Sequence, residues 1–168
     1  SEMCIRDWDI HGYSVSSSAL ISGYSRSHML LEEELSNFLG QEKTLLYSTG
    51  YQANLGVIKS LVSRGSFIFA DQLNHASLID GSILSRANFK RYEHKDVKEL
   101  EALLNKCPDS REKLIISDSL FSMDGDLAEL KELEQRLKKY EAKLLIDEAH
   151  SLGVFGYQGR GLVFEHLL

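Results

Sequence analysis

The chain of 168 residues has few of the residues that mark specialised folds. It contains one proline, Pro108, and two cysteines, Cys4 and Cys107, in no CxxC pair. This cysteine usage excludes a disulfide framework and a zinc-finger spacing, and it fits a reducing cytoplasm. No apolar run approaches the roughly 20 residues that a membrane helix needs, and no signal peptide is present. We therefore expect a cytoplasmic protein without a membrane partner.

The sequence also lacks an excess of positive charge. It has 19 Lys and Arg residues against 25 Asp and Glu residues, which gives a net charge of −6. A general nucleic-acid binder usually presents a basic face, so we expect no nucleic-acid partner. Hydrophobic residues make up 43% and charged residues 26%, which is typical of a globular protein with one core.

A phosphate-binding P-loop is missing as well. Residues 144–150 read "LLIDEAH", which looks like the Walker B strand end of a helicase. Such an enzyme needs G-x-x-x-x-G-K-[ST] upstream, and no Gly-Lys-Ser or Gly-Lys-Thr occurs anywhere in the chain. Asp147, His150 and His75 offer metal-ligand chemistry, but no tight His/Cys/Asp spacing joins them. We therefore expect neither a nucleotide hydrolase nor a metal site.

What is present is a regular alternation of short apolar runs and amphipathic segments. Apolar residues at helical spacing predict helices at 28–39, 51–62, 76–85, 96–105 and 127–140, and Asp96 is a candidate N-cap. Short apolar runs predict strands at 44–47, 67–70, 89–92, 114–117 and 144–146. This order predicts an α/β fold, a three-layer sandwich with a mostly parallel sheet. Ligands of such sheets bind beyond the carboxyl ends of the strands.

Polar residues stand at the carboxyl ends of these runs, and each has two interpretations. "STGYQAN" (48–54) starts a helix, where free N–H groups and the helix dipole attract an anion; it is otherwise a plain Ser/Thr cap. His75 follows the strand at 67–70 and can stack on a flat ring or shuttle a proton; it is otherwise a capping or surface histidine.

Two further strand ends carry the same ambiguity. Ser122 follows the strand at 114–117 and can offer its hydroxyl to a ligand or cap the turn "MDGD". Asp147 ends a buried strand, where a carboxylate is costly without a partner such as a cation, and His150 can reach the same ligand. Asp147 can instead simply cap the segment that follows it.

Six stretches in constant order carry a family resemblance. They are "ISGYS" (21–25), "YSTGYQAN" (47–54), "DQLNHASLIDG" (71–81), "HKDVKELEALL" (94–104), "FSMDGDLAEL" (121–130) and "IDEAHSLGVFGYQGRG" (146–161). From about Ser14 onward the chain resembles the α-oxoamine synthases, a branch of the fold-type-I enzymes that depend on pyridoxal 5′-phosphate (PLP). The resemblance implies a partial PLP-binding large domain at 21–168, preceded by an N-terminal segment with a Ser-rich loop at 1–20.

The resemblance also implies roles for individual residues. Asp147 would pair with the pyridinium nitrogen, which keeps the ring an electron sink. His75 would stack on the ring and approach the substrate, and His150 would lie near the 3-hydroxyl group. The backbone N–H groups of Gly50 and Tyr51 would hold the phosphate. The remaining cofactor contacts would be the family serine at Ser122 and the acidic position at Asp118.

The reaction implied by the resemblance is a decarboxylative condensation. L-Alanine would combine with a pimeloyl thioester of CoA or acyl-carrier protein to give 8-amino-7-oxononanoate, CO2 and free thiol, a step of biotin biosynthesis. Family members are homodimers, so a homodimer is expected. Two alternatives remain open: a glycine-using relative such as 2-amino-3-ketobutyrate CoA ligase, and a non-catalytic chain on the same scaffold.

The sequence departs from the family pattern in two places. The family's Schiff-base lysine lies on a later strand in a Ser/Thr-rich context, and none of the lysines here has such a context. We therefore expect a fragment that lacks the lysine region and the small C-terminal domain and has no turnover by itself. The family's Gly-rich stretch reads "SVSSSA" at 14–19, and serine reaches positive φ less readily than glycine.

Overall fold

The computed structural model describes residues 17–167, so most of the predicted segment 1–20 lies outside the described residues. The chain divides into two compact units, Ser1–Leu46 and Tyr47–Leu168. The described part of the first unit holds a short π-helical turn, η1 (Ala19–Gly23), and one long helix, α2 (Arg26–Leu39). Helix α2 confirms the helix predicted at 28–39, and it ends at Gly40, whose φ of 65° is the left-handed C-cap conformation.

The strand predicted at 44–47 is wrong, because these residues form no strand. A strand needs a neighbouring ladder for its N–H and C=O groups. Here the Leu46 N–H instead donates to Glu32 Oε1 at 3.1 Å, and the Thr44 hydroxyl accepts a hydrogen bond from Ser36 Oγ at 2.9 Å. The Glu32 side chain of α2 therefore takes a backbone N–H that a strand partner could otherwise satisfy, and Ser36 holds the Thr44 side chain.

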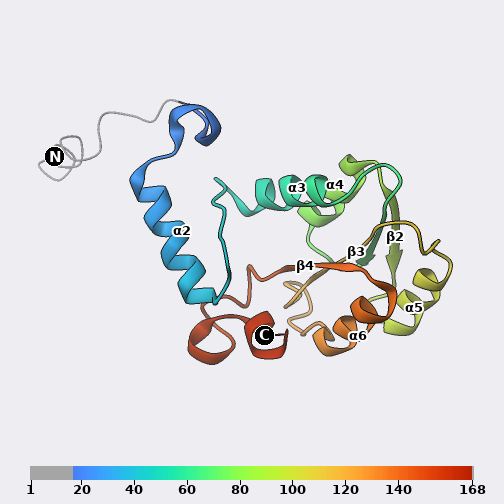
Figure 1. The fold of residues 1–168 in the computed structure, drawn as a ribbon. Coiled ribbons are helices and arrows are strands. Elements are labelled where there is room, and N and C mark those ends of the chain that lie inside the picture. The colour runs from blue at the N-terminus through green and yellow to red at the C-terminus, as the bar shows by residue number, and fades with distance from the viewer. Residues whose placement is uncertain (1–16, 168) are drawn as a thin grey trace, which may run out of the picture. The chain divides into compact units, whose positions relative to one another are not determined.

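The second unit is built on a four-stranded parallel sheet in the order β2-β1-β3-β4 (Figure 1). The strands are β1 (Phe67–Asp71), β2 (Asn88–Tyr92), β3 (Lys113–Asp118) and β4 (Lys143–Asp147). The register pairs Asp71 with Tyr92 and Asp118 with Asp147, so the carboxyl ends of neighbouring strands meet at one edge of the sheet. The parallel sheet and four of the five predicted strands are confirmed.

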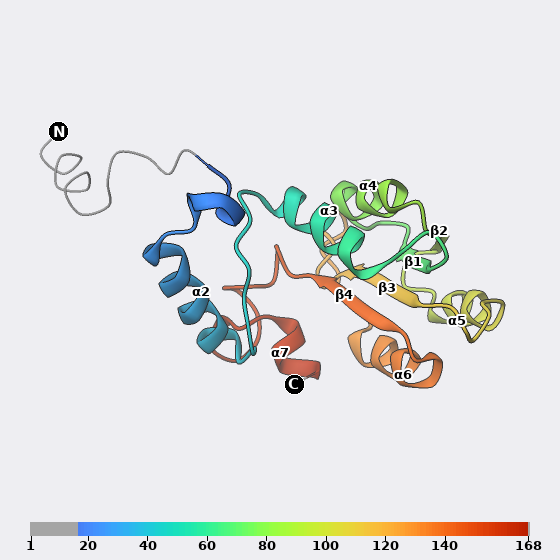
Figure 2. The ribbon, with the colours of Figure 1, turned by 45° about the horizontal axis from the view of Figure 1, so that its top comes forward.

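Helices cover both faces of this sheet, which confirms the three-layer α/β sandwich (Figures 1 and 2). On one face α3 (Gly50–Leu61) and α4 (Ala76–Ser85) bury Ile58 and Leu78 against Ile68 and Ile116. On the other face α5 (Val97–Asn105) and α6 (Leu130–Tyr140) bury their leucines against residues that include Ile115. Alternating strand residues thus feed two separate cores.

Close helix packing on the first face depends on a glycine. A Cβ atom built on Gly81 in α4 would lie 2.9 Å from Ile58 Cδ1 and 3.4 Å from the backbone of Asn54 and Leu55 in α3. Contacts of that length are repulsive for real side chains, so Gly81 lets the two helices approach each other. Helix α3 is thereby held at a fixed height above the sheet edge.

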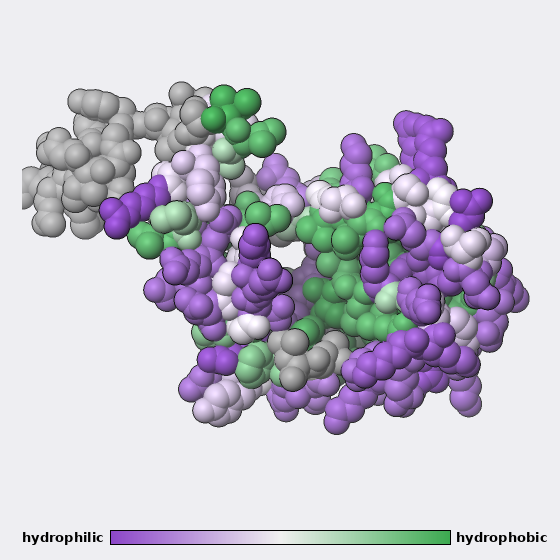
Figure 3. Space-filling view, in the orientation of Figure 1, coloured by the Kyte–Doolittle hydropathy of each residue, from purple (hydrophilic) through white to green (hydrophobic). Residues whose placement is uncertain are grey.

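Two predicted helix starts can be compared with the structure. Asp96 is the N-cap of α5, and its carboxylate accepts from the Lys98 and Glu99 N–H groups at 2.9 Å, as predicted. The helix predicted from Leu127 begins only at Leu130, because Leu127 forms a bridge with Leu120. The exposed side of α5 and α6 is largely hydrophilic (Figure 3).

The chain's C-terminal elements are short. A 3-10 turn, η2 (Tyr157–Gly159), precedes α7 (Leu162–Leu167). Leu162 joins the core that α5 and α6 form. Within the part of the chain that the structure describes, no helix combines the length and the apolar character needed to cross a bilayer.

Candidate active site

A pocket of about 500 Å³ opens at the carboxyl edge of the sheet. Four segments form it: the start of α3, the loop after β1, the end of β3 and the turn after β4. Its lining includes Gly50, Tyr51, His75, Asp118, Asp147 and His150. The structure therefore brings six of the seven predicted site residues together.

The start of α3 forms one wall of the pocket. Thr49 caps the helix, and its hydroxyl oxygen accepts a hydrogen bond from the Gln52 N–H at 3.1 Å. The first N–H groups of a helix, here those of Gly50 and Tyr51, have no partner inside the helix. A Cβ atom on Gly50 would meet nothing within 4 Å, so the space in front of these groups is open. This wall can hold an anion, and the capping interpretation is true of Thr49 at the same time.

Asp147 lines the same pocket from the end of β4. Its Oδ2 atom accepts from Asn54 Nδ2 at 2.7 Å, and its Oδ1 atom accepts from the Ala149 N–H at 2.9 Å. Both donors are neutral, so they orient the half-buried carboxylate without cancelling its charge. A cationic ligand group would complete this site. Asp147 also caps the turn that follows, which confirms the capping interpretation; its pairing with a cation stays a prediction.

Asn54 is a site residue that the sequence interpretation did not single out. It lies on α3, one helical turn after Gly50, and its side-chain amide also donates to Ser77 Oγ at 2.9 Å. The available signal was its position within "YSTGYQAN", because residues i and i+4 share a helix face. Asn54 therefore links the start of α3, which we call the anion wall (Gly50 and Tyr51), to the Asp147 carboxylate.

His75 both caps a helix and lines the pocket. Its Nδ1 atom accepts from the Ser77 N–H at 3.2 Å and lies 2.7 Å from Ser77 Oγ. An atom that accepts from a backbone N–H carries no proton, so the proton of the neutral ring is on Nε2. The His75 backbone N–H donates to Asp118 Oδ2 at 2.7 Å, which ties this loop to the end of β3.

Asp118 is buried at the end of β3, with 4% of its surface exposed. Burial raises the pKa of this carboxyl group to about 6; the nearby Asp147 charge adds to the rise, whereas the hydrogen bond from His75 opposes it. Asn74 also joins the loop after β1 to the end of β3. Its side chain accepts from the Asp118 N–H at 3.2 Å and donates to the Ile116 carbonyl at 3.0 Å.

The last two predicted residues differ in position. His150 is exposed and lines the pocket from the turn after β4. Ser122 is exposed on the turn after β3 and is not part of the lining, so its contact with a cofactor stays a prediction. Among the described residues, no group of three or more His, Cys, Asp and Glu side chains is placed to hold a metal ion.

Glu148, which gives "LLIDEAH" its Walker B appearance, has a structural role. Its Oε1 atom accepts from the Val163 N–H and from Ser151 Oγ, both at 3.0 Å. A Cβ atom on Gly161 would lie 2.6 Å from the same oxygen, so the carboxylate fills the space that this glycine leaves. Glu148 therefore joins the turn after β4 to the start of α7.

Comparisons with known proteins agree with this architecture. Residues 13–166 match the family model described as "Aminotransferase class I and II". The chain is 52% identical over 151 residues to the 8-amino-7-oxononanoate synthase of Nitrosospira multiformis, covering 90% of this chain and 38% of the relative. The chain thus spans about two fifths of the length of this curated relative.

Two solved structures share the fold. A serine palmitoyltransferase from S. paucimobilis, solved with PLP and myriocin bound, is 36% identical with a TM-score of 0.90 and covers 96% of this chain and 40% of its own. An 8-amino-7-oxononanoate synthase from Francisella tularensis is 31% identical, with a TM-score of 0.75. The match covers 99% of this chain and 45% of the Francisella chain. The chain belongs to the aminotransferase class I and II family, within its α-oxoamine synthase branch.

Proposed function

We propose that this chain is part of a PLP-dependent acyltransferase that condenses L-alanine with pimeloyl-CoA or pimeloyl-acyl-carrier protein to 8-amino-7-oxononanoate, CO2 and free thiol. The observation that supports it is one pocket lined by both an open helix start, which suits an anion, and the Asp147 carboxylate, which suits a cation. The relative with 52% identity, named for this activity, supports the substrate choice. Residues 21–168 would be part of the PLP-binding large domain.

The residues present fit PLP by their chemistry. The cofactor carries a phosphate, a flat aromatic ring and a ring nitrogen that can be cationic. The open space at Gly50 and the N–H groups of Gly50 and Tyr51 suit the phosphate. Asp147, which has only neutral donors around it, suits a protonated ring nitrogen. The imidazole of His75 suits a ring face.

When bound, PLP supplies an electron sink that stabilises negative charge on the substrate's α-carbon. Asp147 would keep the proton on the ring nitrogen, and Asn54 would keep the Asp147 carboxylate turned toward it. His75 can donate from Nε2, since Nδ1 is occupied by the Ser77 N–H. Asp118 would hold the His75 loop, and His150 and Ser122 would bind the cofactor's polar substituents.

A nucleophilic lysine completes this chemistry in enzymes that form Schiff bases. Among the described residues that line the pocket, none is a lysine. We therefore predict that the 168-residue chain by itself binds PLP without a covalent link and shows no turnover. We further propose a cytoplasmic homodimer as the active form, which light scattering of the full-length protein would test.

The deciding experiment is an assay of the full-length protein with L-alanine and pimeloyl-CoA. Mass spectrometry should detect 8-amino-7-oxononanoate, and omission of PLP should abolish its formation. A parallel reaction with glycine and acetyl-CoA tests the glycine-using alternative. Product from glycine alone would contradict the proposed substrates and leave the family assignment standing. No visible absorbance band on addition of PLP would contradict the proposed cofactor.

A further inference from the structure

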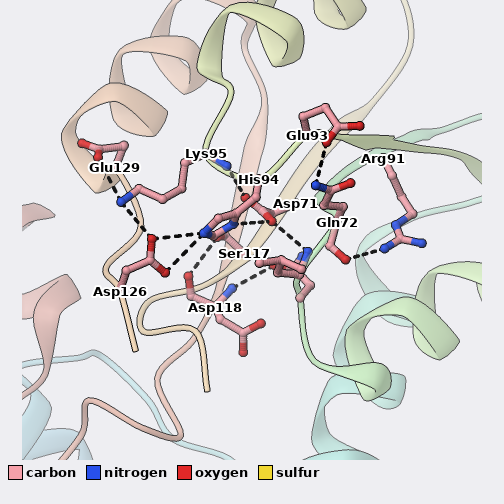
Figure 4. A network of polar contacts seen from close by, with 12 residues as sticks. Asp71, Gln72, Arg91, Glu93, His94, Lys95, Ser117, Asp118, Asp126 and Glu129 are labelled. Carbon is pink, nitrogen blue, oxygen red and sulfur yellow. Dashed lines mark hydrogen bonds and ion pairs between the residues drawn. The ribbon is translucent and has the colours of Figure 1, made fainter. Parts of the chain in front are cut away.

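A second cluster of charged side chains lies at the same edge of the sheet, outside the pocket. Figure 4 shows His94 between two carboxylates, those of Asp71 and Asp126. His94 Nδ1 lies 2.9 Å from Asp71 Oδ1, and His94 Nε2 lies 3.1 Å from Asp126 Oδ2. Carboxylates only accept hydrogen bonds, so both ring nitrogens must donate. With both carboxyl groups ionised, this geometry favours the doubly protonated imidazolium cation.

Asp71 joins this cation to the loop that carries His75. The carboxylate is 1% exposed at the end of β1, and it also accepts from the Leu73 N–H at 2.9 Å and the Lys95 N–H at 2.8 Å. Lys95 has a φ of 59°, a left-handed conformation that is unusual for a non-glycine residue. The hydrogen bond to Asp71 holds this turn, so the loops after β1 and β2 share one anchor.

Asp126 joins the cation to the turn that carries Ser122. The Phe121 N–H donates to the Asp126 carbonyl at 3.0 Å, and the Gly125 N–H donates to the Phe121 carbonyl at 2.8 Å, which closes the turn at 121–126. The Phe121 ring is buried and packs edge-to-face on His94, with ring centroids 4.5 Å apart. The His94 ring therefore contacts both ends of this turn.

From this geometry we propose that His94 is a positioning residue: as a cation between Asp71 and Asp126, it fixes the His75 loop, which lines the pocket, and ties it to the Ser122 turn. We call the contacts of His94 with Asp71 and Asp126 the clamp. Its effect on cofactor binding rests on the proposed function. His94 does not line the pocket, so it acts through these two segments.

The surrounding charges favour the cation. The groups that face His94 are Asp71 and Asp126, and Tyr92, Lys95 and Glu129 lie beside them. Lys95 pairs with Asp126 at 3.2 Å and with Glu129 at 3.5 Å. Burial lowers the pKa of His94, but the hydrogen bonds to Asp71 and Asp126 outweigh it and leave the pKa above 6.5. The clamp is therefore complete below pH 6.5 and is lost as pH rises through this raised pKa.

Two measurements that need no cofactor test the clamp. Long-range 1H–15N NMR of the His94 ring should show both nitrogens protonated in the acid range and a titration midpoint above 6.5; a midpoint at or below 6.5 would overturn the proposal. His94→Gln should speed amide hydrogen exchange at Phe121 and Gly125 by about tenfold, because a charge-assisted contact is lost. Unchanged exchange would also overturn it. Asp126→Asn removes the charge that pairs with His94 Nε2. This variant replaces His94→Gln in the test if His94→Gln folds poorly.

PLP titration tests the positioning role. His94→Gln should weaken PLP binding about tenfold at pH 6.5. We expect the PLP affinity of the wild type to fall at higher pH, and the variant should lack this fall. Asp124→Asn, in the same turn but outside the cluster, should match the wild type in both. Faster exchange with unaltered PLP affinity and pH profile would refute the positioning role. Failure of the wild type to bind PLP would refute the proposed function instead, with the NMR and exchange results still deciding the clamp.

Discussion

The side-chain amide of Asn54 lies 2.7 Å from the carboxylate of Asp147, although 93 residues separate them in the chain. The same nitrogen donates to Ser77 Oγ at 2.9 Å, so both amide hydrogens are used. One side chain thereby connects α3, the start of α4 and the end of β4. The orientation of the Asp147 carboxylate depends on this connection.

We expect Asn54→Ala to weaken PLP binding while the fold is retained. A hydrogen bond to a charged group contributes about 1.5–3 kcal/mol, so the dissociation constant should rise roughly tenfold or more. Gln52→Ala, on the exposed side of the same helix, is the matched control. Titration of PLP by absorbance would measure both variants, and equal affinities would contradict the orienting role of Asn54.

Asp147→Asn should separate cofactor binding from stability. The amide keeps the shape of the side chain but removes the charge, so PLP binding should lose about 2–5 kcal/mol. The free energy of unfolding without PLP should fall by only about 1 kcal/mol, because the amide has one acceptor oxygen and keeps one of the two hydrogen bonds, and no cationic partner is lost among the described residues. Asp124→Asn is the control of equal charge change. A wild-type PLP affinity in Asp147→Asn would remove the support for a pyridinium partner.

Asp118 predicts a specific pH dependence of stability. Its folded-state pKa is raised to about 6 from 3.8, so the folded state holds a proton that the unfolded state releases between these values. Stability should therefore fall as pH rises from about 4 to about 6, and the loss should persist above pH 6. Asp118→Asn should abolish this fall and unfold at higher urea than the wild type at pH 7.5.

A comparison of Asp118→Asn with the wild type at pH 4 is the control for this experiment. At pH 4 the wild-type carboxyl is largely protonated, so Asp118→Asn and the wild type should unfold at similar urea concentrations. The amide oxygen that Asp118→Asn introduces can still accept the His75 N–H, so the loop contact is preserved. A constant difference between the two proteins at every pH would show that the effect is not titration of Asp118.

Two glycines should respond to valine in opposite ways. Gly81→Val places atoms against Ile58 and the backbone of α3, so it should cost about 1–3 kcal/mol of stability. A Cβ atom at Gly50 meets nothing within 4 Å, so we expect Gly50→Val to change stability by less than about 0.5 kcal/mol. Its side chain would instead occupy the anion wall and weaken PLP binding. Urea unfolding and PLP titration of both variants check this, and a destabilised Gly50→Val would contradict it.

The fold was largely predictable because β1 and β3 are short, buried apolar runs and β4 is a short, half-buried one. The alternation of such runs with amphipathic segments predicts a parallel sheet. The strand predicted at 44–47 failed for the opposite reason, since an apolar run does not reveal whether a ladder partner exists. Leu127 fitted the apolar stripe of α6, but its backbone is used by the bridge to Leu120.

The location of the pocket was predictable from the rule that ligands bind at the carboxyl ends of parallel strands. Parallel strands end at one edge, so residues placed after different strands converge there, and six of the predicted residues do. Asn54 and His94 were not predicted, although both lie inside quoted motifs. Their roles depend on which side chain they face across the sheet, and spacing along the chain does not contain that information.

The free edge of β4 has a consequence for handling the protein. Among the described strands, β4 pairs only with β3, so its other side presents unpaired backbone groups. Between Lys143 and Asp147 it holds Leu144, Leu145 and Ile146, and hydrophobic surface gathers around this strand (Figure 3). An apolar edge without internal charges is a template for intermolecular pairing. Aggregation of the 168-residue chain should therefore start at β4, and its onset should depend steeply on concentration.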